Sequence, residues 1–106
     1  MKLKPIKNKK KITAIFEKGR VINSKNMSVR VFDLQDEKPG YVVSVPKKNF
    51  PLAVNRNLIK RRLRAALTDL LINKNKLSFF LIYTSKKIIP GLILKKEIKN
   101  LIKKII

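Results

Sequence analysis

The sequence predicts a small α/β domain, an α+β sandwich in which helices pack on one small mixed sheet. Three segments carry apolar residues at helical spacing, and three others have the alternating or continuous apolar pattern of strands. These segments follow one another in the order α-β-β-α-β-α, which is typical of a single layered domain. The 106 residues suffice for one compact domain and are too few for two. We therefore expect a single domain over residues 1–106.

The chain begins with a predicted arm and a short helix. Residues 1–8 are basic and contain a proline, so we expect them to form a flexible arm. Apolar residues at i, i+3 and i+4 start at Ile12, and Gly19 stands where a helix C-cap is common. This pattern predicts a helix over 9–18.

Two strands are predicted next. From 26 to 34 the side chains alternate, with Val29 on the apolar face and Arg30 on the other, as in a half-buried strand. Residues 41–45 are predicted to form a second strand. The turn-forming residues 35–40 between them include Pro-Gly, so the two strands are predicted to pair as a hairpin.

The second half of the chain alternates helix, strand and helix. One apolar stripe predicts a long helix that ends at 73–76. The stripe consists of Ile59, Leu63, Ala66, Leu67 and Leu70. The near-continuous apolar run 77–83 is typical of a strand covered on both faces. A final helix is predicted from a second stripe, Leu94, Ile98, Leu101, Ile102 and Ile105.

The charge is strongly positive. Twenty-seven Lys and Arg residues oppose six Asp and Glu, which gives a net charge of +21. Such an excess attracts polyanions, so nucleic acid, an anionic membrane surface and an acidic protein are candidate partners. Many of the lysines are equally well explained as ordinary solvated surface. Ordinary solvated surface explains the arginines less well, because four of the six lie within residues 56–64.

The composition also argues against several classes of function. The sequence has no His or Cys, and its acids are scattered, so we expect neither a catalytic residue nor a metal site on this chain. The longest apolar run, 79–83, is far shorter than the roughly 20 residues that span a bilayer. No secretory signal pattern is present, and we expect a cytoplasmic protein without membrane contact.

The most informative segment is 53–64. On a helix, three basic residues and one asparagine form a cationic flank beside the apolar stripe. The flank consists of Asn57, Lys60, Arg61 and Arg64. Arg56 and Arg62 lie at the edges of the stripe and must bend away from it. A basic amphipathic helix can also be a solvated face or a membrane-surface helix. Planar arginine forks and interleaved asparagines suit phosphate contacts, which favours nucleic acid.

This segment resembles a known family. Residues 53–64 have the pattern Ala-Val-x-Arg-Asn-x-x-Lys-Arg-x-x-Arg, preceded by the basic pair in Ser44–Lys48. Together they are similar to the motif helix of the protein subunit of bacterial ribonuclease P. Phe16–Gly19 resembles the end of that family's first helix, and Ser78–Ile82 resembles its third strand. The resemblance covers nearly the whole chain in order and implies a fold of the ribosomal S5 domain 2-like type.

The resemblance implies a function in tRNA processing. In this family the RNA subunit, with bound Mg²⁺, cleaves the 5′ leader from precursor tRNA, and the protein assists by binding both the RNA subunit and the leader. The expected partners are therefore ribonuclease P RNA, with one protein per RNA, and precursor tRNA. The chain would be an enzyme subunit without catalytic residues of its own. A structural rRNA-binding protein of the ribosome is the alternative.

The resemblance also assigns residues. The expected contacts to RNA are Lys47, Lys48, Asn55, Arg56, Asn57, Lys60, Arg61 and Arg64. The expected cleft for the leader is lined by Phe16, Ser28, Arg30 and Phe32. Arg30 stands where the family commonly has an aromatic residue, which would make leader contact more electrostatic. For Phe16 and Phe32 the alternative is a place in the hydrophobic core.

Overall fold

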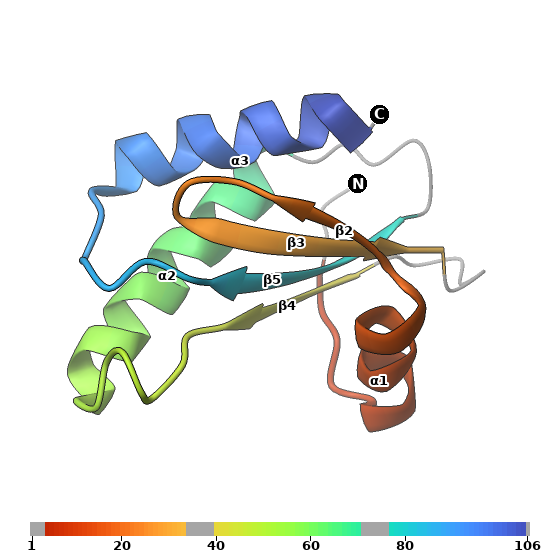
Figure 1. The fold of residues 1–106 in the computed structure, drawn as a ribbon, viewed down its shortest axis with the longest axis horizontal. Coiled ribbons are helices and arrows are strands. Elements are labelled where there is room, and N and C mark those ends of the chain that lie inside the picture. The colour runs from red at the N-terminus through yellow and green to blue at the C-terminus, as the bar shows by residue number, and fades with distance from the viewer. Residues whose placement is uncertain (1–3, 34–39, 71–76, 106) are drawn as a thin grey trace.

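The computed structural model describes residues 4–33, 40–70 and 77–105. Within these ranges the chain forms one five-stranded sheet with helices on both of its faces (Figure 1). The elements in chain order are β1 (Lys4–Pro5), α1 (Lys9–Lys18), β2 (Arg20–Asn23), β3 (Met27–Phe32), β4 (Gly40–Ser44), α2 (Ala53–Leu70), β5 (Ser78–Tyr83) and α3 (Gly91–Ile105). The predicted mixed α/β class and all three predicted helices are confirmed.

The strand order is β1-β4-β5-β3-β2, which corrects one prediction. The segments β3 and β4 were expected to pair as a hairpin, but β5 lies between them, antiparallel to β3 and parallel to β4. The hairpin is instead formed by β2 and β3, with Arg20 opposite Val31. The apolar strand β5 suits the centre of the sheet, because β3 and β4 pair with its two edges and one of its faces lies in the core. Of the expected turn at 35–40, only Gly40 lies within the described residues. The predicted end of the long helix at 73–76 lies outside them.

Two short edge strands were not predicted. In β1, Lys4 and Pro5 pair in parallel with Gly40 and Tyr41, and the Ile6 amide donates to the Tyr41 carbonyl at 2.9 Å. The described part of the expected flexible arm is therefore partly attached to the sheet. The other strand, β2, has only four residues and is mostly exposed, so no apolar alternation marks it in the sequence.

The core lies between one face of the sheet and the helices α2 and α3. The buried sheet residues are Met27, Val29, Val31, Tyr41, Phe79, Leu81 and Tyr83. The helices contribute the buried residues of the two predicted stripes, Ile59, Leu63, Ala66, Leu67, Leu94, Ile98 and Leu101. Ile102 of the second stripe is half-buried and packs against them. The opposite face of the sheet is only partly covered, because α1 contacts β3 and β5 near one end (Figure 1).

A polar network joins α3 to the turn between β2 and β3. The Glu97 carboxylate accepts hydrogen bonds from the Asn26 amide at 3.0 Å and from the Asn26 side chain at 2.7 Å, and also from the Ser24 hydroxyl. The Asn26 carbonyl in turn accepts from the Thr84 amide at 2.9 Å. One of the few acids of the chain is thus used to hold α3 on the sheet.

Helix α1 has defined ends. The Asn8 side chain caps it by accepting from the Lys10 and Lys11 amides at 2.9 and 3.3 Å. Gly19 ends it with φ −68°, and its amide donates to the Ile15 carbonyl at 2.9 Å. A Cβ atom at Gly19 would overlap this carbonyl and lie 3.2 Å from the Val31 carbonyl oxygen. Glycine is needed here mainly because a Cβ would overlap the last turn of α1 itself, with the backbone of β3 also close, and not for a left-handed conformation.

We expect Gly19→Ala to lower the free energy of unfolding by about 1–3 kcal/mol, because the added methyl overlaps the Ile15 carbonyl and distorts the last turn of α1, which also lies close to β3. Urea denaturation measures the change. Gly91→Ala is the matched control, since a Cβ there would meet only the Arg62 side chain at 3.8 Å. Equal stability of the two variants would contradict the close approach at Gly19.

Candidate nucleic-acid interface

The basic flank of α2 is formed as the sequence predicts. Asn57, Arg61 and Arg64 are exposed and Lys60 is half-buried. The stripe residues whose side chains are described, Ile59, Leu63, Ala66 and Leu67, are buried. The burial pattern separates the two sides because side chains along an α-helix turn by about 100° per residue. These four residues, here called the α2 flank, therefore present amines, guanidinium groups and an amide to solvent.

Two other arginines of α2 serve the fold. The Arg56 guanidinium donates through Nη1 to the carbonyls of Phe50 and Pro51, both at 2.9 Å. Arg62 donates through Nη1 to the Ile89 carbonyl at 2.9 Å. Each arginine thus ties a neighbouring loop to the helix. The predicted RNA contact of Arg56 stays a prediction, and one side of its guanidinium already has protein partners.

The loop 45–52 leads from β4 into α2 and carries the predicted basic pair. Lys47 and Lys48 are both exposed. Phe50 anchors the loop, because its ring is buried and lies 5.7 Å from the Tyr83 ring. Asn55, the remaining predicted contact, lies partly exposed in the first turn of α2.

A second cluster stands on the less covered face of the sheet. The Phe16 ring of α1 lies 5.7 Å from the Phe80 ring of β5, tilted by 58°. The Arg30 guanidinium carbon lies 4.1 Å from the centroid of the Phe16 ring, and Arg30 Nη1 donates to the Phe16 carbonyl at 2.7 Å. Such a stack is a cation–π interaction. Phe16 remains 43% exposed, so it lies at the surface and not in the core.

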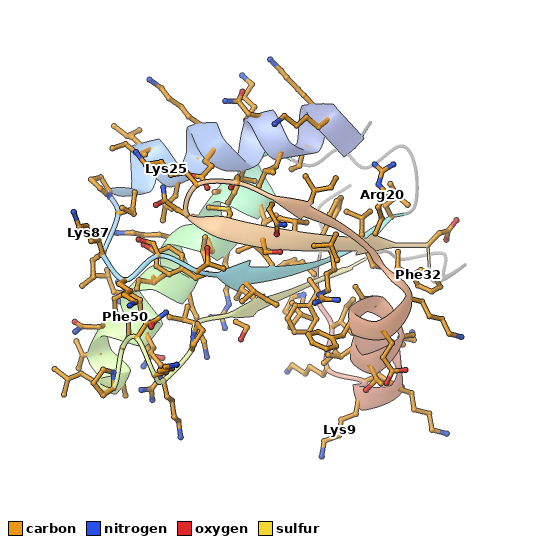
Figure 2. All side chains as sticks on the ribbon, in the orientation of Figure 1. Lys9, Arg20, Lys25, Phe32, Phe50 and Lys87 are labelled. Atoms are coloured by element: carbon orange, nitrogen blue, oxygen red, sulfur yellow. The ribbon has the colours of Figure 1, made fainter. Side chains whose placement is uncertain are left out.

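The other predicted cleft residues lie on the same face but apart from this stack. Ser28 and Phe32 are half-buried and alternate with the core residues of β3. Phe32 lines a hollow of about 460 Å³ together with Lys18, Arg20 and Asp33. Figure 2 labels Phe32 and Arg20 at the same end of the molecule. The structure therefore brings Phe16 and Arg30 together and places Phe32 at the end of the strand, beside different cations.

Phe80 is a further aromatic residue beside the Phe16 stack, which the sequence did not reveal. It pairs with Arg30 across β3 and β5, so the two side chains share one face of the sheet. The run 77–83 was expected to be covered on both faces, yet Phe80 and Ile82 are only half-buried. The signal available in the sequence was the geometry of a strand. Successive side chains point to opposite faces, which puts Phe80 on the face opposite Phe79.

The described residues contain neither a protein metal centre nor a membrane span. No three His, Cys, Asp or Glu side chains in residues 4–33, 40–70 and 77–105 are placed to hold a metal ion. In the same ranges, no helix combines the length and apolar character that crossing a bilayer requires.

The fold and these surfaces define a small, strongly basic α/β domain with an exposed cationic helix flank. The family model Ribonuclease P matches residues 1–106, and the chain belongs to this family. The structure of the Staphylococcus aureus RNase P protein is similar with a TM-score of 0.82 and 22% identity, covering 96% of this chain and 94% of that one. The structure of the RNase P protein from Thermotoga maritima is similar with a TM-score of 0.77 and 17% identity, covering 95% of this chain and 96% of that one. Comparison with curated proteins gave no match.

Family membership connects the chain to ribonuclease P and to tRNA processing, and it implies association with ribonuclease P RNA. The predicted resemblance is confirmed over the whole chain, and the solved structures confirm the predicted fold class. The ribosomal alternative receives no support.

Proposed function

We propose that the chain assists a catalytic RNA in removing the 5′ leader of precursor tRNA, by docking on ribonuclease P RNA and holding the leader. The observation that carries this proposal is the α2 flank, whose arginines are exposed and whose Lys60 is half-buried, while the apolar stripe of the helix faces the core. Lysine and arginine side chains on such a flank neutralise RNA phosphates and release counterions. Arginine adds bidentate geometry to these contacts.

The face with Phe16 and Arg30 supports binding of the leader. Single-stranded nucleotides bind proteins by stacking their bases on aromatic or guanidinium planes while cations neutralise the backbone. Phe16 and Arg30 supply both kinds of plane in one stack. Arg30 lies where a further ring is common in the family, so this subsite combines stacking with positive charge.

Hydrolysis is assigned to the RNA subunit with its Mg²⁺. The described part of the chain offers no cluster of acids for metal-assisted chemistry, and the whole sequence has no His. The protein therefore contributes binding and charge neutralisation. We also propose that one copy binds each RNA and that the complex acts in the cytoplasm. A membrane-surface function is disfavoured because the apolar stripes of α2 and α3 are buried in the core and cannot also enter lipid.

Reconstitution with a bacterial ribonuclease P RNA at low Mg²⁺ tests the proposal. We expect the protein to increase the rate of precursor-tRNA cleavage, because cations from the protein lower the need for metal ions to screen the RNA phosphates. The RNA alone at the same ionic strength is the control. If the protein gives no stimulation at any Mg²⁺ concentration at which the RNA folds, the proposal is wrong.

A further inference from the structure

A basic hollow lies away from the Phe16 stack, between the loops that follow β4 and β5. It has a volume of about 500 Å³ and is lined by Pro46, Lys48 and Asn49 of loop 45–52 and by Lys86 of loop 84–90. This volume falls within the range of about 300–1,000 Å³ that is usual for ligand sites. Figure 2 labels one residue of each loop, Phe50 and Lys87, at the same end of the molecule.

Loop 45–52 is held by the protein interior. Its Phe50 side chain is buried, and the Phe50 amide donates to the Pro46 carbonyl at 3.2 Å. The Arg56 guanidinium donates to two further carbonyls of the loop at 2.9 Å. Lys48 and Asn49 thus stand on a fixed turn, so little backbone ordering is needed when they bind.

Loop 84–90 is held in a similar way. The Tyr83 hydroxyl donates to the Lys87 carbonyl and accepts from the Ile89 amide at 3.1 Å. Burial raises the pKa of this hydroxyl above its ordinary value. Arg62 holds the Ile89 carbonyl from the side of α2. Lys86 is therefore also presented from an ordered loop.

The lining has the chemistry of a phosphate site. Two exposed lysines from separate loops face one hollow, an asparagine adds an amide donor, and none of the lining residues is acidic. The loop that carries Lys48 continues directly into α2 and its flank. A phosphate of an RNA backbone suits this arrangement, because ammonium groups bind phosphate as point charges without reading base sequence.

We propose that the hollow between Lys48, Asn49 and Lys86 binds a backbone phosphate of RNA and extends the interface beyond the α2 flank. This inference rests on the proposed function, since it assumes that the chain binds ribonuclease P RNA or its substrate. It adds Lys86 and Asn49, which the sequence did not indicate, to the interface. Held loops of this kind lower the entropic cost of binding.

Binding of Lys86→Ala is measured against KCl concentration with two probes, ribonuclease P RNA alone and precursor tRNA alone. Loss of one phosphate contact should reduce the slope of log K against log salt by about 0.7–0.9, and affinity should fall several-fold. Lys103→Ala is the matched control, because it removes the same charge from an exposed site in the last turn of α3. Lys86→Arg should keep the wild-type slope.

The two probes identify the source of the phosphate. A reduced slope with ribonuclease P RNA places the phosphate in the RNA subunit, and one with precursor tRNA places it in the substrate. If Lys86→Ala behaves like Lys103→Ala with both probes, the inference is overturned, while stimulation by the wild-type protein still supports the proposed function. If the wild-type protein neither binds nor stimulates, the proposed function itself fails. Equal melting temperatures of the variants exclude unfolding as the cause.

Discussion

Replacing Arg61 and Arg64 together by alanine is expected to weaken binding to ribonuclease P RNA by roughly tenfold per arginine at physiological salt. Both side chains are exposed on the α2 flank, so their loss removes cations without opening the core. The slope of log K against log salt should flatten by about one unit per lost phosphate contact. Filter binding over a KCl series measures both quantities.

The control for this variant is Lys103→Ala with Lys104→Ala. It removes the same formal charge from the exposed last turn of α3. Because long-range attraction depends on total charge and specific contacts depend on position, the control should lose only the long-range part. An α2 variant that matches this control in affinity and slope would show that the flank does not contact RNA.

The core of the fold was predictable because it follows helical periodicity. The described side chains of the stripes through Ile59 and Leu94 are buried where the spacing places them, except that Ile102 is half-buried. The neighbours of each strand were not predictable, because β5 inserts between β3 and β4. A strand's alternation fixes which face is buried but says nothing about which strand pairs with it. The short strands β1 and β2 show no such alternation. They are recognised in the structure only by their pairing with β4 and β3.

The candidate site was predictable where it depends on one helix alone. Counting 100° per residue places Asn57 and Arg61 on the solvent side of α2, as the structure has them. The same count gives only the edge position of Arg56 and Arg62. Their carbonyl partners belong to loops that fold back on α2, so these hydrogen bonds depend on the complete fold. The stack of Phe16 on Arg30 likewise needs α1 to pack over β3.

Phe16→Ala is expected to reduce affinity for precursor tRNA with a 5′ leader by about 1–3 kcal/mol, which is the usual value of one stacked base. Mature tRNA lacks the leader, so its affinity should hardly change. The expectation follows from the 43% exposure of Phe16, which leaves part of the residue open to a ligand. Dissociation constants of the holoenzyme for the two RNAs measure the difference.

Phe16→Tyr distinguishes stacking from support of the fold. Tyrosine keeps an aromatic plane of the same size above Phe80, so it should restore the preference for the leader. If Phe16→Ala lowers both affinities equally, the ring acts through the fold, since it also contacts Phe80 and lies under Arg30. Thermal unfolding of each variant shows whether such a common loss follows stability.

Arg30 determines how the leader can approach Phe16. Its guanidinium lies over the ring at 4.1 Å and is fixed by its hydrogen bond to the Phe16 carbonyl. A base must therefore stack on the outer plane of Arg30 or use the part of Phe16 that Arg30 leaves exposed. In either case Phe16→Ala also removes the ring that packs against the guanidinium, which then keeps only its hydrogen bond to the backbone carbonyl of residue 16. The loss for leader-bearing tRNA should accordingly be accompanied by a flatter salt dependence, which an aromatic contact alone would not produce.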